Sequence, residues 1–192
     1  MNKFILLISF LIIAISCNQE SSEQKKDDLL KRKLDQKNGF REFTLGNSKD
    51  SLDSSNLACS DYSTGDEITC RVINYEKYLG PVPIDMLNLV FEENILKRVY
   101  FFFPLEGDNF NKVLDIFTEA YGIHESEINE YSNNERYYVW KGKNTTINIF
   151  PNFSDRSFLV QFSSKEANDL IDEIKDEKYS KKYQKEGNKV NL

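Results

Sequence analysis

The chain has 192 residues, with 25 Lys and Arg against 31 Asp and Glu, and 40 % of its residues are apolar. This length and composition supply one ordinary globular core and exclude a large multidomain enzyme. The net charge of −6 and a sequence pI near 5.0 argue against sequence-independent nucleic-acid binding, which needs clustered Lys and Arg.

The N-terminus has the pattern of an export signal. Lys3 supplies a positive charge, and residues 4–15 form an apolar run that only Ser9 interrupts. The run is shorter than the roughly 20 apolar residues that a membrane-spanning helix needs. It fits the apolar region of a signal peptide, which has about 7–15 residues. We therefore expect residues 1–16 to be a signal peptide that is removed.

The residues that end this run resemble a known processing motif. Ala14-Ile15-Ser16-Cys17 is similar to the lipobox of bacterial lipoproteins, in which small residues precede an obligatory cysteine. The resemblance implies that diacylglycerol is attached to the Cys17 thiol, that a signal peptidase cuts before it, and that acyl chains hold the protein at a membrane. Ala14 stands where the family most often has Leu. An ordinary cleaved signal, or a buried N-terminal element, is the alternative interpretation.

The same resemblance bears on the membrane and on the charge of the mature chain. Asn18 follows the cysteine, instead of the Asp that holds lipoproteins at the inner membrane of enteric bacteria, and this favours an outer-membrane site where the cell has an outer membrane. Removal of residues 1–16 takes away only Lys3, so the mature balance is 24 − 31, or −7. Each buried CH₂ contributes about 0.8 kcal/mol, so more than one acyl chain makes attachment lasting.

Polar composition then divides the chain into segments. Residues 17–38 hold the lipidated cysteine and a stretch rich in Gln, Ser, Lys, Asp and Glu, which predicts a tether. A short amphipathic helix built on Leu29, Leu30 and Leu34 is the alternative. We expect a folded domain over residues 39–178 and a flexible Lys-rich tail over residues 179–192.

The two remaining cysteines predict a disulfide. Cys59 and Cys70 form an even pair whose separation suits a small closed loop in an oxidising compartment. No C-x-x-C motif supports a redox role. Two cysteines and the single His124 do not have zinc-ligand spacing, so we expect neither a metal nor another cofactor.

Alternating apolar residues predict an α+β domain, an antiparallel sheet with helices on one face, built as two tandem units of a helix and three strands. The first unit begins with a short helix capped by Asn47 or Ser48 and ending near Leu52. Its strands lie around residues 68–72, 87–92 and 98–103. Glu93-Asn94 joins the last two strands as a hairpin.

The second unit has the strongest helix signal of the chain, from an N-cap at Asp108 to a stop at Gly122. Its apolar face consists of Phe110, Val113, Leu114, Phe117 and Tyr121. Strands follow around residues 138–140, 145–149 and 158–162. A last helix is predicted from a capping box of Ser163 and Glu166. Its apolar stripe is Ala167, Leu170, Ile171 and Ile174.

In element order alone, residues 40–175 look like the modules of beta-lactamase inhibitory proteins and of small outer-membrane assembly lipoproteins. No binding residue carries over from either family, because no motif of theirs is matched beyond the lipobox.

The sequence contains few residue patterns that could form a catalytic site. His124 is the lone histidine and lies in a polar stretch after a helix stop, which is typical of a solvated loop residue. Gly46-Asn47-Ser48-Lys49-Asp50 begins like a nucleophile elbow, but Asp50 replaces the second glycine. A small envelope hydrolase that uses His124 is therefore only an alternative, and we expect the protein not to be an enzyme.

The sequence offers better candidates for a binding site than for a catalytic site, because both faces of the strand at residues 98–103 carry aromatic side chains. One set must point away from the helices, and aromatic patches anchor protein interfaces. The candidate binding residues are Tyr75, Tyr78, Arg98, Tyr100, Phe102 and Tyr137. The alternative is core packing, with the strand buried on both faces or the patch covered by tail residues.

The sequence thus predicts a lipid-anchored binding module for another envelope or secreted protein. An inhibitor, immunity or accessory role fits such a module. A structural or assembly accessory of the outer membrane is the alternative within the same class.

Overall fold

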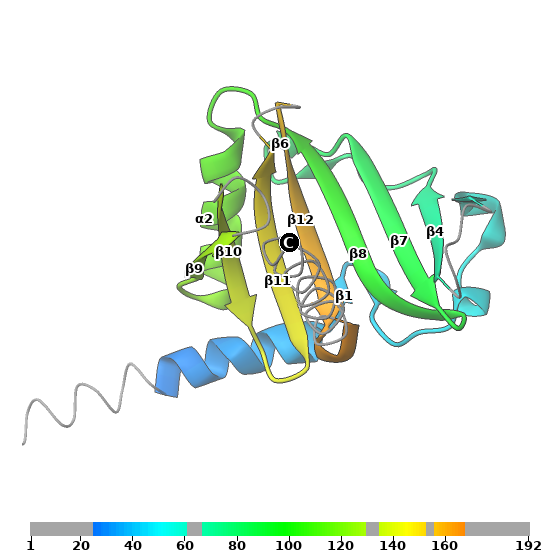
Figure 1. The fold of residues 1–192 in the computed structure, drawn as a ribbon, viewed down its shortest axis with the longest axis horizontal. Helices are drawn as coiled ribbons and strands as arrows, with labels where there is room; N and C mark the ends of the chain where they lie inside the picture. Colours follow the sequence, from blue (N-terminus) through cyan, green and yellow to red (C-terminus); the bar gives the residue numbers. More distant parts are fainter. Residues whose placement is uncertain (1–24, 61–66, 130–134, 153–155, 168–192) are drawn as a thin grey trace, which may run out of the picture.

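The computed structural model describes residues 25–60, 67–129, 135–152 and 156–167. An eight-stranded antiparallel sheet lies at its centre (Figure 1). The strands are β3 (Leu57–Ser60), β4 (Glu67–Val72), β7 (Met86–Glu92), β8 (Ile95–Pro104), β9 (Glu125–Asn129), β10 (Glu135–Lys141), β11 (Thr145–Asn152) and β12 (Ser157–Ser164). Their spatial order is β3-β4-β7-β8-β12-β11-β10-β9. Two four-stranded meanders therefore meet where β8 pairs with β12, with Phe101 opposite Val160.

Helices and short ribbons complete the described chain. The helices are α2 (Asn109–Tyr121), one over residues 25–37 and one that begins at residue 165. The ribbons pair β1 (Gly39–Phe40) with β2 (Phe43–Thr44) and β5 (Tyr78–Leu79) with β6 (Val82–Pro83). The mixture of helices and a large antiparallel sheet confirms the predicted α+β class. Among the described residues, no helix combines the length and apolar content needed to cross a membrane.

One face of the sheet, called the core face here, carries the hydrophobic core. Val99, Phe101 and Phe103 of β8 lie opposite Phe162, Val160 and Phe158 of β12, and all six are at most 1 % exposed. Each such side chain contributes about 1.5–3 kcal/mol when it is fully buried. The Phe40 ring of β1 lies 4.1 Å from the Phe101 ring, so the first ribbon also packs on this face.

Helix α2 covers another part of the core face. Gly122 ends it in the left-handed region, with φ 91°. The Phe117 ring lies 5.8 Å from the rings of both Trp140 and Phe162, because the apolar side chains of α2 recur on one side of the helix. Asp108 occupies the predicted N-cap position, but its carboxylate accepts a bond from the Asn111 side chain (2.7 Å) and makes no backbone cap.

Residues 25–37 form a helix where the sequence favoured a tether. Leu34 is 1 % exposed and belongs to the core, whereas Leu29 is 56 % exposed. The Asp35 carboxylate accepts backbone N–H bonds from the turn between β10 and β11, at Lys143 (2.7 Å), Asn144 (2.8 Å) and Thr145 (3.0 Å). These contacts, with residues more than a hundred positions away, fasten the helix to the sheet. Residues 17–24 and the predicted tail lie outside the described residues.

Three details of the predicted units are corrected. Each meander has four strands, because β3 and β9 were missed. The short helix near Ser48 is a 3₁₀ turn, η1 (Lys49–Ser51), whose Asp50 N–H donates to the Ser48 hydroxyl (3.2 Å). A second 3₁₀ turn, η2 (Ser54–Asn56), follows it.

The capping box before the last helix is also shifted. Ser163 belongs to β12, and the Ser164 hydroxyl accepts the N–H of Ala167 (3.3 Å), so Ser164 is the cap. The rest of the predicted stripe, from Leu170 to Ile174, lies outside the described residues.

Candidate functional site

Strand register assembles a row of apolar side chains on the second face of the sheet, opposite the core face. Met86 lies opposite Phe102, Phe102 opposite Leu159, and Leu159 opposite Phe150, while the Tyr137 ring stacks on Phe150 at 5.2 Å. These five residues, called the apolar row, come from β7, β8, β12, β11 and β10. All five are half-buried. The row is a continuous strip that crosses the join between the two meanders.

A second row, called the polar row, runs beside it. Its members are Arg71, Asn88, Tyr100, Gln161, Asn148 and Val139, each opposite the next on neighbouring strands. Gln161 and Asn148 are both 8 % exposed, and the Asn88 Oδ1 atom is buried without a hydrogen-bond partner. Burial raises the pKa of the Tyr100 hydroxyl, because the charged phenolate would lose its hydration.

Arg98 lies one further step along β8, opposite Ser163 and Val90. It is 9 % exposed and forms an ion pair with Glu67 of β4. Its Nε atom is buried without a hydrogen-bond partner. A guanidinium so far from water needs a carboxylate partner, and Glu67 supplies it.

A cluster of charged side chains lies at the β9 end of the second face. The Tyr137 hydroxyl and the Lys141 ammonium both donate to Glu127. These bonds lower the pKa of Glu127, and the bond to Glu127 raises the pKa of Lys141. The cluster therefore stays ionised at neutral pH and holds the Tyr137 ring in place beside Phe150.

The structure brings together four of the six predicted binding residues. Arg98, Tyr100, Phe102 and Tyr137 share the second face, but the other two tyrosines do not lie there. Tyr75 packs against the hydrophobic core, and Tyr78 is 56 % exposed in the β5–β6 ribbon, which contacts α2. Sequence reasoning missed Met86, Phe150 and Leu159. Phe150 and Leu159 each lie between two buried residues of the core face, and Met86 directly precedes the buried Leu87. Only the strand register shows that the three align.

His124 lies in a small cavity of about 200 Å³ between the helix over residues 25–37, the end of α2 and β10. Its ring is 4.9 Å from Tyr138 and 5.3 Å from Trp140, and its Nδ1 atom is buried without a partner. Burial lowers the pKa of the imidazole. The expected solvated loop residue is therefore half-buried, because the turn at Gly122 directs it against β10. Within the described chain, no hydroxyl or carboxylate hydrogen-bonds to His124.

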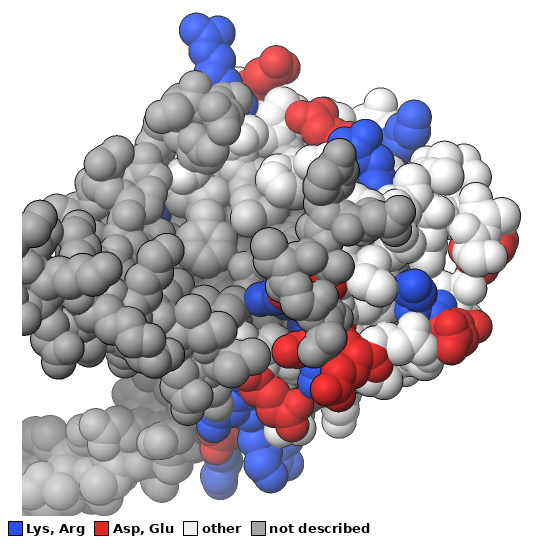
Figure 2. All heavy atoms as spheres, turned by 45° about the vertical axis from the view of Figure 1, so that its right-hand side comes forward, with Lys and Arg blue, Asp and Glu red and all other residues white. Residues whose placement is uncertain are grey.

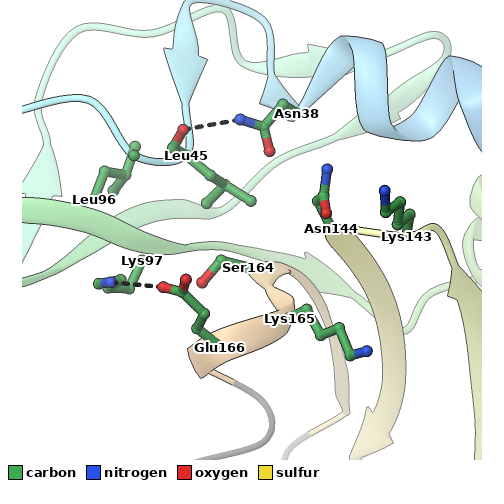
Figure 3. Close-up of a pocket in the computed structure, with 10 residues that line it drawn as sticks. Asn38, Leu45, Leu96, Lys97, Lys143, Asn144, Ser164, Lys165 and Glu166 are labelled. Atoms are coloured by element: carbon green, nitrogen blue, oxygen red, sulfur yellow. Dashed lines mark hydrogen bonds and ion pairs between the residues drawn. The ribbon is translucent and has the colours of Figure 1, made fainter.

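A larger cavity of about 540 Å³ opens at the end of the sheet where β12 stops (Figure 3). Its lining comes from the segment after the helix over residues 25–37, the start of β8, the turn between β10 and β11, and the end of β12. Among its described lining residues are Lys97, Lys143 and Lys165 and one acidic residue, Glu166, which pairs with Lys97 at 3.4 Å. The Ser164 hydroxyl in this lining caps the following helix. The described lining is therefore basic and brings no nucleophile together with a base.

The predicted disulfide is confirmed. Cys59 and Cys70 lie directly opposite each other in β3 and β4 and are joined. The described segments contain no group of three or more His, Cys, Asp or Glu residues that could hold a metal ion.

Comparisons with protein-family models, with curated proteins and with solved structures found no match to this chain.

Proposed function

We propose that this is a lipid-anchored protein of the bacterial cell envelope that binds another protein through the second face of its sheet and catalyses no reaction. The apolar row carries the proposal. An antiparallel sheet face in contact with water normally presents polar side chains. Here five neighbouring strands each present a large, half-buried apolar side chain. Aromatic side chains and methionine in such a strip are typical of protein interfaces.

The charges around the apolar row define the partner's chemistry. Glu125 and Glu127 lie at the β9 end, Glu67 and Glu92 lie opposite each other at the β4 end, and the chain carries a net charge of −6. Figure 2 shows acidic side chains in the lower part of the described surface, with Lys and Arg side chains beside and below them, under an area that is largely uncharged. Three of these four carboxylates are paired with Arg98 or Lys141, so it is the net negative charge of the chain that favours a partner with a rim of Lys or Arg, which steers association. The partner in this proposal is an envelope or secreted protein with an apolar centre and such a rim. An inhibitor, immunity or accessory role fits this arrangement.

The anchor in this proposal is Cys17, through the lipobox resemblance of residues 14–17, which lie outside the described segments. The Cys59–Cys70 disulfide is consistent with an oxidising compartment outside the cytoplasm. The outer membrane is favoured by Asn18, as argued above.

We also infer that the two meanders are copies of one plan, with the helices on the core face. The strand order supports this, because the last strand of each meander, β8 or β12, is the one at the join. Helix α2 contacts Phe158 and Phe162 on the core face, and Leu34 of the helix over residues 25–37 belongs to the same core.

The test is capture of the partner from envelope extract by the full-length protein, with an affinity tag inserted between Cys17 and residue 24. A Phe102→Ala, Tyr137→Ala double variant removes two anchors of the apolar row. We expect its affinity for the purified partner to fall at least about tenfold, because each central aromatic anchor contributes more than about 1 kcal/mol. Higher salt is expected to slow association.

Tyr78→Ala is the matched control, because Tyr78 is an exposed tyrosine outside the second face. Its capture is expected to equal that of the parent. A partner that binds the double variant as tightly as the parent contradicts the proposal, and so does a partner without a basic surface.

A further inference from the structure

The second face of the sheet is more buried than an open face would be. Asn148 and Gln161 are 8 % exposed and Arg98 is 9 % exposed. Side chains of these types are mostly exposed in proteins. Val90 and Val139, on the same face, are each 2 % exposed. Something therefore covers this face in the folded chain.

The described elements outside the sheet make their contacts on the opposite face. Rings of α2 contact Phe158, Trp140 and Phe162, and Phe40 of β1 contacts Phe101. The helix over residues 25–37 contributes Leu34 to the same core. Val90, Val139 and Ala167 are buried but do not belong to that core cluster. Among the described residues, these contacts leave the cover of the second face unaccounted for.

The chain that follows β12 has the position and the composition of a cover. Ala167, the last described residue, is 4 % exposed and lies three residues after β12, a central strand of the sheet. Leu170, Ile171 and Ile174 follow it in the sequence. Their spacing is that of the apolar face of an amphipathic helix.

The charges of this segment also suit the face. Residues 168–177 carry five Asp and Glu residues against Lys175, whereas the polar row ends at Arg71 and the neighbouring Arg98 is short of one hydrogen-bond partner. The apolar stripe complements the apolar row, and its acidic flanks are opposite in charge to Arg71 and Arg98, whose guanidinium groups bond to Met86 and Glu67.

We propose that residues 168–192 of this same chain cover the second face of the sheet, so that a partner reaches the apolar row only by displacing them. The raised pKa of Tyr100 agrees with a covered position. This goes beyond the proposed function, because it concerns the isolated protein and holds whether or not a partner binds there.

The test is hydroxyl-radical footprinting of two purified proteins, the full chain and a chain that ends at Ala167. Mass spectrometry compares oxidation of Tyr100 and Phe102 with that of Phe101 and Phe103, their neighbours on β8 that face the core. In the full chain all four are expected to be protected. In the shortened chain, oxidation of Tyr100 and Phe102 is expected to rise several-fold, while Phe101 and Phe103 stay protected.

Two results overturn the proposal. Strong oxidation of Tyr100 in both chains means that the face is open in the intact protein. Equal protection of Tyr100 in both chains means that another segment, or a second copy of the chain, is the cover. No partner is present in this experiment, so failure of the capture experiment leaves its outcome unaffected.

A full-length variant separates uncovering from unfolding of the shortened chain. Ile171→Asp with Ile174→Asp places charge in the apolar stripe, and Asp172→Asn is the control in the same segment. We expect increased oxidation of Tyr100 only in the isoleucine variant, with Phe101 protected in both. Unchanged oxidation of Tyr100 overturns the proposal. If the partner-binding proposal also holds, the isoleucine variant binds the partner more tightly than the parent.

Discussion

His124 makes the stability of the fold depend on pH. It is the one histidine of the chain, and burial lowers its pKa below the ordinary value of 6.5. The unfolded chain therefore takes up a proton at a higher pH than the folded chain does. Stability is complete above pH 6.5 and is lost as the pH falls from there toward the folded-state pKa. We expect the Tm to drop as the pH falls below 6.5 and His124→Asn to flatten the curve, as measured by calorimetry. Parallel curves for the two proteins would falsify this.

Asp35 is the residue that fastens the helix over residues 25–37 to the sheet. Asp35→Ala removes the acceptor of three backbone N–H groups in the turn at residues 143–145. We expect the free energy of unfolding to fall by about 1–2 kcal/mol, the usual effect of losing a capping side chain. Urea unfolding measures it. Asp28→Ala, an exposed change in the same helix, is the control and is expected to stay within about 0.5 kcal/mol of the parent.

At the scale of elements, the disulfide holds an edge strand. Cys59 and Cys70 are 11 residues apart, and closing so small a loop stabilises the fold by about 3 kcal/mol. Reduction is expected to lower the free energy of unfolding by about 2–3 kcal/mol in urea titrations. Hydrogen exchange should increase at β3, because β4 is its one partner among the described strands, and not in β8 or β12. Equal urea midpoints with and without reductant would contradict the prediction.

The sequence correctly predicted those elements that have one buried face, because their apolar residues recur at a regular spacing. The six central strands and α2 each have one face in the core, so their apolar period is clear. β3 and β9 are edge strands with exposed side chains, and they leave no such period. The helix over residues 25–37 contributes only Leu34 to the core cluster, and its contacts at Asp35 depend on distant residues.

The candidate site also has features that the sequence predicted and features that it did not. Residues on one strand, such as Tyr100 and Phe102, were correctly placed together, because alternation is a local property. The side of the sheet on which Tyr75 and Tyr78 lie depends on where the β5–β6 ribbon packs, which local patterns do not encode. Alignment of Phe102 with Leu159 and Phe150 depends on register between distant strands.

At the scale of the whole molecule, the proposed acylation of Cys17 predicts where the protein resides. In the proposed bacterial envelope, the parent is expected in the membrane fraction and a Cys17→Ser variant in the soluble fraction, because the variant has no thiol to acylate. Intact-mass measurement of the parent is expected to show the added acyl mass on a chain that begins at Cys17. Asn18→Gln is the control and should remain in the membrane fraction. Identical fractionation of parent and Cys17→Ser would show that the anchor lies elsewhere.

The pairing of β8 with β12 fixes when the molecule is able to fold. β12 is the last of the described strands along the chain, yet it lies at the centre of the sheet between β8 and β11. During synthesis and export β8 emerges well before its partner, so the edge of β8 that pairs with β12 stays unpaired until residues 157–164 have emerged. Such late, non-local pairing is slow, and a nascent chain with exposed apolar strands is prone to aggregate. A chain cut short before Ser157 would therefore lack β12, and β8 and β11 would each have an unpaired edge open to proteases.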